Sequence, residues 1–224
     1  MKPLHLLLTA TMALALLACG GKKSDNDREE TEEETEYVAD AKIKFYLVAD
    51  NDSAFAVIQD LSEAYPQLSD LLQYNINSRD FKVADSDKAA VDEILRQPEA
   101  RRILGPDRTV SWLLDSFNLQ DHDIYTFFLL LRPEIFTPTE TIDIRFSNYD
   151  TGLSCYESID MRFGDSDAET WAKVTRDNIG RQIAIVVDGE VTSAPIVQSE
   201  ITGGVAQITG HDMKKIFDRI AREK

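Results

Sequence analysis

The chain has 224 residues, of which 40 are acidic and 24 are Lys or Arg, so its formal net charge is −16 at pH 7. This acidic balance argues against binding to nucleic acid or to anionic lipid surfaces, because both interactions need clustered Lys and Arg. Two cysteines cannot supply a disulfide framework. The roughly 180 residues that follow the N-terminal region are enough to bury a hydrophobic core instead.

Residues 1–18 have the features of a secretory signal: a positively charged start, mostly Leu and Ala at positions 4–17, and small Ala18 before Cys19. The order "LLACG" resembles the bacterial lipobox, so we expect Cys19 to be acylated and to anchor the protein in a membrane. A cysteine that is simply buried beside leucines is the alternative. Gly20 stands where Asp would resemble an inner-membrane retention signal. We therefore expect a lipid-anchored protein of the cell envelope, at the outer membrane, on the periplasmic side or at the cell surface.

Residues 19–36 are predicted to form a flexible acidic tether. Positions 20–36 contain eight acids and almost no apolar side chain, so packing cannot compensate for the entropy of ordering them. Such a stretch after a lipidated cysteine also resembles the surface-export signals of some bacteria, and a plain spacer is the alternative. Cys155 is left without an intramolecular partner, and we expect it to be buried and inert.

The folded part is expected to span residues 37–224. A strand is predicted at 42–49, followed by a helix that buries Phe55, Ile58 and Leu61 and by a short amphipathic piece at 68–72. Ser86 is the expected cap of the next helix, which should end at Pro98 or at Gly105–Pro106. Alternation and apolar runs predict four further strands, at 110–114, 123–131, 139–148 and 158–164.

The last third of the chain carries the strongest local signals. Asp165 or Ser166 is expected to cap a helix over 167–178 whose inward face carries Ala168, Trp171 and Val174 or Thr175, with Gly180 as its left-handed stop. Strands at 181–188 and 190–197 are joined by Asp188–Gly189, a pair that favours a type I′ turn. A turn at Gly203–Gly204, a strand at 205–209 and a helix complete the chain. Thr209 and Asp212 suit a capping box for that helix, whose apolar stripe is Met213, Ile216, Phe217, Ile220 and Ala221.

These elements predict an α+β fold of antiparallel sheets with helices packed on one face, and ferredoxin-like pieces are compatible with it. We divide the folded part into residues 37–135 and 136–224. Residues 37–80 are expected to complete the sheet of the same domain, because one strand and one helix are too little to fold alone.

One segment, residues 170–210, has an order of marked residues that composition alone does not explain. The residues are Thr175, Asn178, Gly180, Ala184, Ile185, Asp188, Gly189, Ser193, Ala194, Pro195, Ile201, Gly203, Gly204, Ile208 and Gly210. This order resembles the head subdomain of the first periplasmic domain of SecD and of fused SecDF, accessory subunits of the bacterial Sec preprotein translocase. A weaker similarity extends the match to residues 81–212. By this resemblance 136–224 is head-like and 37–135 is base-like.

The resemblance implies a polypeptide-binding or accessory module linked to Sec-dependent protein export. The expected partners are unfolded secreted polypeptide or the periplasmic regions of the Sec translocase. The candidate binding residues lie in the hairpin and the glycine loop: Asp188, Gly189, Ser193, Ala194, Pro195, Gly203 and Gly204. Two alternatives stay open: these residues serve backbone geometry alone, or the protein is a surface-displayed or structural lipoprotein without a Sec role. Past the signal no apolar run is long enough to span a bilayer, so we do not expect the motor activity that SecD places in its membrane helices.

The sequence gives no support for catalysis. His122 and His211 are isolated, the run at 121–123 fits a solvated turn, and Cys155 has no histidine at a nucleophile's spacing. We therefore expect no catalytic residues, no metal site, no cofactor and no small-molecule substrate. A polar cleft that joins His211 or Cys155 to a carboxylate would revive the enzyme hypothesis.

Overall fold

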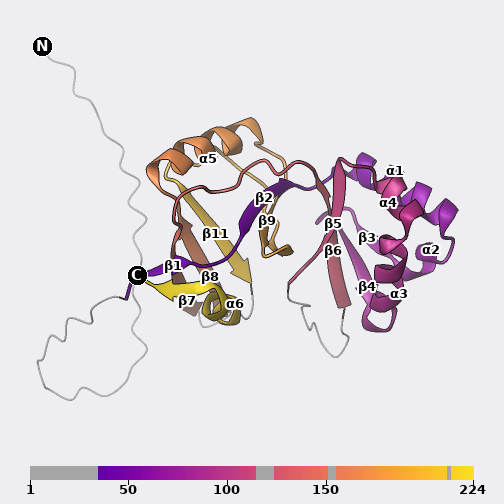
Figure 1. The fold of residues 1–224 in the computed structure, drawn as a ribbon, viewed down its shortest axis with the longest axis horizontal. Coiled ribbons are helices and arrows are strands. Elements are labelled where there is room, and N and C mark those ends of the chain that lie inside the picture. The colour runs from indigo at the N-terminus through magenta and orange to yellow at the C-terminus, as the bar shows by residue number, and fades with distance from the viewer. Residues whose placement is uncertain (1–34, 115–123, 151–154, 211–212) are drawn as a thin grey trace, which may run out of the picture. The chain divides into compact units, whose positions relative to one another are not determined.

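The computed structural model describes residues 35–114, 124–150, 155–210 and 213–224, which belong to one compact unit, Thr35–Lys224 (Figure 1). Cys19 and the expected signal and tether, up to residue 34, lie outside the described residues. The described part forms three sheets in which all named strand pairs are antiparallel, together with helices, so the α+β prediction is confirmed.

The largest sheet has five strands in the order β11 (Val205–Gly210), β8 (Cys155–Arg162), β7 (Asp143–Asp150), β1 (Tyr37–Ala39) and β12 (Ala221–Glu223). The second has the order β10 (Glu190–Ser193), β9 (Ile183–Val187) and β2 (Ile43–Leu47). The third has the order β3 (Gln73–Asn75), β4 (Asp80–Ala84), β6 (Ile124–Leu131) and β5 (Arg108–Trp112). The first strands of the unit, β1 and β2, therefore pair with strands that lie beyond residue 136.

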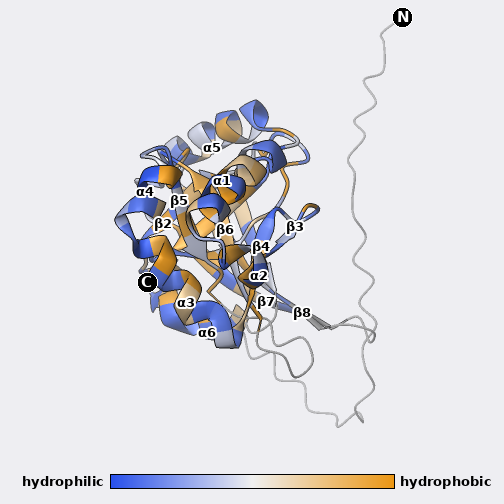
Figure 2. Ribbon diagram, turned by 90° about the vertical axis from the view of Figure 1, so that its right-hand side faces the viewer, coloured by the Kyte–Doolittle hydropathy of each residue, from blue (hydrophilic) through white to orange (hydrophobic). Residues whose placement is uncertain are grey.

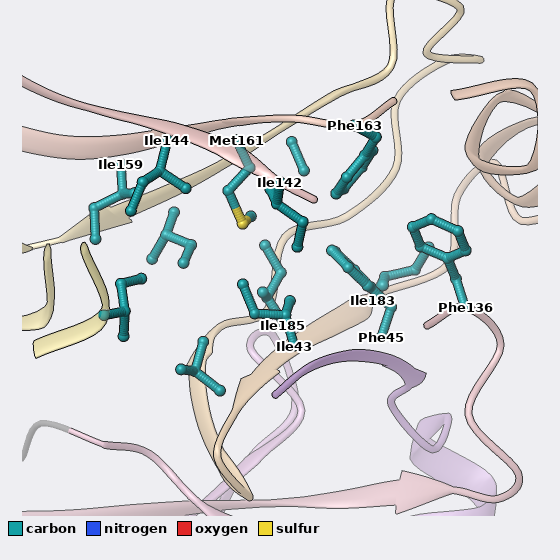
Figure 3. Close-up of a cluster of buried hydrophobic side chains, with 14 of the residues drawn as sticks. Ile43, Phe45, Phe136, Ile142, Ile144, Ile159, Met161, Phe163, Ile183 and Ile185 are labelled. Carbon is teal, nitrogen blue, oxygen red and sulfur yellow. The ribbon is translucent and has the colours of Figure 1, made fainter. Parts of the chain in front are cut away.

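The sequence of β9, "IAIVV", is apolar at every position because both faces of this strand are buried. Ile183 and Ile185 point into a core shared with the five-stranded sheet, as Figure 3 shows. Ala184 and Val186 point the other way, into a smaller core with Phe128 of the four-stranded sheet. The three-stranded sheet thus lies between the other two, and an alternating pattern would have placed polar side chains in one of the two cores.

Four helices cover the other face of the four-stranded sheet: α1 (Asn51–Ala64), α2 (Leu68–Leu71), α3 (Asp85–Arg96) and α4 (Pro98–Leu104). In Figure 2, hydrophobic residues interrupt the hydrophilic ones along α1 and α3, as expected for helices with one buried face. Two more helices, α5 (Asp165–Asp177) and α6 (Met213–Ile220), pack onto the core of the five-stranded sheet. The predicted apolar stripe of α6 is confirmed, since Met213, Ile216, Phe217 and Ile220 are all buried.

Several predicted details of the first helices were wrong. Phe55 is 50% exposed, because the buried face of α1 is set by Ala54, Val57 and Leu61. Ser86 lies inside the first turn of α3 and is not its cap. The predicted end of α3 before Pro98 is confirmed, and Pro98 also begins α4, because proline lacks only an N–H that a helix's first turn leaves unused. Gly105, with φ of 73°, ends α4.

The ends of the later elements also differ from prediction. The cap position of α5 is Gly164, so neither Asp165 nor Ser166 is its cap. Thr209 lies within β11, several residues before α6, so it does not cap that helix, and Asp212 is outside the described residues. The strand expected over 190–197 ends at Ser193, before Pro195, which cannot donate to a ladder.

Candidate functional site

The hairpin between β9 and β10 has the predicted turn. Asp188 and Gly189 have φ angles of 51° and 96°, as a type I′ turn requires. The turn is fastened on both sides: Lys42 N donates to Asp188 Oδ1 at 3.0 Å, and Ser111 Oγ donates to the Gly189 carbonyl at 3.0 Å. The tip is therefore held by the start of β2 and by β5.

The edge of β10 beside the hairpin is occupied from within the unit. Leu114 N donates to the Val191 carbonyl at 2.7 Å, and Leu113 forms a parallel bridge with Val191. An added strand would have to displace this segment. Polypeptide binding by strand addition therefore needs a different edge.

The loop after β10 is fastened to the start of β9. Ile183 N donates to the Pro195 carbonyl at 2.9 Å, and Val197 N donates to the Arg181 carbonyl at 2.9 Å. Gln182, 5% exposed, donates through Nε2 to the Ala194 carbonyl at 2.8 Å. The segment that follows Ser193 is thus held along β9 without continuing the β10 strand.

Gly204 is required by its neighbours. Its φ is 61°, and a Cβ at this position would lie 2.5 Å from the Cβ of Ala168 on α5. Its carbonyl accepts from Phe163 N at 2.8 Å, which starts the pairing of β11 with β8. The backbone of this glycine therefore sets how closely α5 approaches the sheet.

A pocket of about 240 Å³ lies between α5, β9, the loop after β10, and β11. None of its lining residues is charged, and most are apolar. They are Trp171, Ile183, Ile185, Pro195, Ile196, Val197, Gln198, Ser199, Ile201, Ala206 and Gln207. The arrangement suits an apolar group and offers no partner to a charged one.

Helix α5 holds two walls of this pocket in place. Trp171, 4% exposed, donates through Nε1 to the Val205 carbonyl at 2.9 Å and packs on Phe45, with ring centroids 4.7 Å apart. One turn later, the buried Thr175 Oγ1 accepts from Ile201 N at 2.9 Å. The loop that leads into β11 is therefore tied to α5 at both ends.

The start of α5 is fixed by two carboxylates from different segments. Asp167, 4% exposed, accepts from Thr139 N at 2.7 Å, from Glu140 N at 2.8 Å and from Thr139 Oγ1 at 3.0 Å. In return, Glu140 Oε2 accepts from Ser166 N at 3.1 Å and from Asp167 N at 3.2 Å. A side chain on Gly164 would collide with Glu140, which explains the glycine at the cap position. This exchange replaces the local cap that the sequence analysis expected.

The register of β11 gives the pocket a polar lip. Since Phe163 pairs with Gly204, the backbone groups of Ala206 point to β8, whereas those of Gln207 point away from β8. The side chain of Gln207 is engaged elsewhere, because Nε2 donates to Asp160 Oδ1 at 2.5 Å. Within the described residues, nothing hydrogen-bonds to the Gln207 N–H or C=O. Among the described residues, a backbone donor and acceptor without a hydrogen-bond partner thus lie beside an apolar pocket.

An ion pair lies beside strand β2. Lys44 Nζ donates to Glu134 Oε1 at 2.7 Å, and this hydrogen bond lowers the pKa of the Glu134 carboxyl and raises the pKa of Lys44. Next to this pair, Ile135 N donates to the Phe45 carbonyl at 2.9 Å. The ion pair thereby helps to keep the segment before β7 along β2.

The predicted site residues do not form one surface. Pro195 lines the pocket and Gly204 leads into its β11 wall, but Asp188 and Gly189 lie at the other end of β9, about 16 Å from Ile183 along an extended strand. Helical spacing predicts Trp171 on a buried helix face but does not assign it to a site, and Gln207 is not among the predicted site residues. No local pattern marks Gln207, because its free backbone depends on the order of strands in the sheet.

His211 and residues 121–123, which include His122, were considered for chemistry but lie outside the described residues. The side chain of Cys155 is not described either. Among the residues that the structure does describe, no group of three or more His, Cys, Asp or Glu is placed to hold a metal ion. No helix in the described ranges is long and apolar enough to cross a bilayer.

Comparison with known proteins supplies the family context. Residues 121–221 match the family model described as SecDF, P1 head subdomain. The protein translocase subunit SecD of Acidaminococcus fermentans is 39% identical over 79 residues, which cover 35% of this chain and 19% of that protein. SecD of Rhodothermus marinus is 29% identical over 134 residues, covering 59% of this chain and 21% of that protein. The matched part is therefore about a fifth of the length of these two relatives.

Two solved structures are similar at low identity. One, described as SecDF in a super-membrane-facing form, has a TM-score of 0.38 and 22% identity, covering 77% of this chain and 17% of that chain. Another, described as a membrane component SecDF that enhances protein export, has a TM-score of 0.35 and 20% identity, covering 76% of this chain and 55% of that chain. Both TM-scores are below 0.5, so the assignment rests on the family model and the sequence alignments. The chain thus carries a SecD-head-like module, similar to the P1 head subdomain of the protein-translocation subunit SecDF.

Proposed function

We propose that this chain is a lipid-anchored envelope protein whose folded part binds extended polypeptide as an accessory to Sec-dependent export, without catalytic chemistry of its own. The observation that carries the proposal is the apolar pocket with the unpaired backbone of Gln207 at its lip. The match of residues 121–221 to the SecDF P1 head supports the link to export. The sequence around Cys19 supports the anchor.

The binding mode follows from the two parts of the site, the backbone of Gln207 and the apolar pocket. A segment in extended conformation adds beside β11 and exchanges backbone hydrogen bonds with Gln207, which supplies affinity without sequence selectivity. One side chain of the segment then enters the pocket between Trp171 and Ile201. A dry protein cavity of about 150 Å³ takes up benzene, so a pocket of about 240 Å³ has room for one large side chain.

We expect each contact to be weak and reversible. Burial of one large apolar side chain contributes about 1.5–3 kcal/mol, and a few backbone hydrogen bonds contribute about 1 kcal/mol each. Part of this gain is lost in ordering the segment, so the dissociation constant for a single segment is roughly 0.1 to 10 mM. Weak binding suits a module that must release polypeptide as export proceeds.

In-cell photo-crosslinking tests the binding site in the full chain. A photoreactive amino acid replaces Ile196, which lines the pocket and is 43% exposed. A second strain carries it at Ile76, which is 54% exposed, follows β3 and is not a lining residue. Position 196 should crosslink many newly secreted polypeptides and position 76 should not. Equal labelling at both positions, or one defined envelope partner at position 196, would reject polypeptide binding and favour a structural lipoprotein.

The anchor has its own test. The Cys19→Ser variant should lose incorporation of labelled palmitate and should be released from washed membranes, because the acyl chains are the proposed anchor. Retention of the label in this variant would reject Cys19 as the lipidated residue.

A further inference from the structure

The chemistry of the pocket selects the kind of side chain that can enter it. Trp171 and Ile183 form broad apolar walls, and the small Ala206, 8% exposed, leaves the space beside β11 open. No charged residue lines the pocket, so a Lys, Asp or Glu side chain would lose hydration without gaining a partner of opposite charge. Small side chains such as Ser or Ala would leave most of the 240 Å³ unfilled. Large apolar side chains are therefore favoured.

The net charge of the protein favours some polypeptide segments over others. The whole chain carries a net charge of −16 at pH 7, and the folded unit, residues 35–224, contains 33 acidic and 20 basic residues. A field of one sign raises the local concentration of ligands of the opposite sign and repels ligands of the same sign. Since the pocket itself is uncharged, this field acts on the residues that flank the buried side chain.

On this basis we propose that the pocket accepts segments in which one large apolar residue is flanked by Lys or Arg, and discriminates against segments with flanking Asp or Glu. The proposal rests on the proposed function and specifies which polypeptides the site binds. In an extended segment, alternate side chains point to opposite sides. Cationic residues directly before and after the anchor therefore face solvent, where the net negative charge of the unit acts on them, while the anchor is buried.

Three nine-residue peptides with the same backbone and the charged residues directly beside the central position test this selection: STTKFKTTS, STTEFETTS and STTKSKTTS. Equilibrium dialysis with a radiolabelled acetyl group measures their binding to the full chain, purified from its host envelope and held in nanodiscs of zwitterionic phosphatidylcholine. At 20 mM salt the peptide with Lys and Phe should bind about fivefold more tightly than the peptide with Glu and Phe, and at 0.5 M salt the difference should fall below about twofold. The peptide that lacks Phe should show no saturable binding.

The outcomes separate this proposal from the proposed function. Equal binding of both Phe peptides at low salt would overturn charge selection and leave polypeptide binding intact. Failure of every peptide, with saturable uptake of oleate, would assign the pocket to acyl chains and reject both proposals. Equal binding of the two Lys peptides would reduce the effect to non-specific attraction and would also overturn the proposal.

Variants locate the binding. Ala206→Phe should fill the pocket and abolish saturable binding of the peptide with Lys and Phe. Because a buried substitution can disturb folding, Ile196→Glu tests the same point at a more exposed position of the lining, and it should weaken binding at least tenfold. Ile76→Glu is the matched control, with the same charge change at a similarly exposed isoleucine, and it should leave binding within twofold of the parent. A loss with Ile76→Glu equal to that with Ile196→Glu would overturn the pocket as the binding site.

Discussion

Asp167 is expected to be the most sensitive polar residue of the candidate site, although it touches no ligand. Its carboxylate is 4% exposed and accepts three hydrogen bonds from Thr139 and Glu140. The substitution Asp167→Ala leaves two backbone N–H groups and one hydroxyl without this acceptor. Hydrogen bonds to charged groups contribute about 1.5–3 kcal/mol each, and unsatisfied buried donors add a desolvation cost. Since the three bonds share one carboxylate and part of the gain offsets its desolvation, we expect a loss of about 3–5 kcal/mol.

The assay is thermal unfolding of the full chain, followed by circular dichroism. For a domain of this size each kcal/mol lowers the Tm by about 2–4 °C, so the expected decrease is roughly 6–20 °C. Asp167→Asn keeps one acceptor oxygen but directs an NH₂ group toward a donor, so its loss of unfolding free energy should be at least half that of Asp167→Ala. Asp165→Ala removes an exposed carboxylate from the same turn and should change stability by less than about 0.5 kcal/mol. A loss below about 1 kcal/mol for Asp167→Ala would refute the reasoning that this exchange holds α5 in place.

Two further predictions concern local structure. The side chain of Asp50 accepts from Ser53 N at 2.8 Å, and hydrogen bonds from Ser53 lower the pKa of this carboxyl. The stabilisation that Asp50 provides is therefore present above the unfolded pKa of about 3.9 and is lost as the pH falls through the lower folded pKa. Asp50→Ala should lower the free energy of unfolding by about 1 kcal/mol at pH 7 and by less in acid. Urea titrations that show the same loss at both pH values would contradict this. Gly204→Ala forces a Cβ against Ala168 and should cost more than about 2 kcal/mol, whereas Gly189→Ala, with open space around it, should cost only the strain of positive φ, about 1 kcal/mol. Equal losses for the two glycines in the same titrations would reject the close approach of α5.

Local chemistry made part of the fold predictable. The Asp188–Gly189 turn follows from two positive φ angles, and the stripe of α6 follows from helical spacing. Gly180 likewise has the left-handed φ, 80°, expected after α5. In each case neighbouring residues in the sequence contain the whole reason for the structure, so no knowledge of the fold is needed.

The features that the sequence did not reveal depend on distant segments. The carboxylate that caps α5 comes from Glu140, more than twenty residues upstream. Trp171 reaches its hydrogen-bond partner, the Val205 carbonyl, across 34 positions. In the part of the chain that the structure describes, the Gln207 backbone lacks a hydrogen-bond partner because β11 is the edge strand of its sheet. A single sequence shows none of these pairings, since strand order and helix position are set by the packing of the whole unit.

The most direct test of the central claim is amide hydrogen exchange at Gln207, measured with and without a saturating amount of the peptide STTKFKTTS. The account predicts fast exchange in the free protein, because this N–H has no partner within the described residues, and at least tenfold slower exchange when the peptide pairs with β11. The amide of Leu114, already bonded to Val191, should not change. Unchanged exchange at Gln207 while the peptide is bound would contradict polypeptide binding beside this strand.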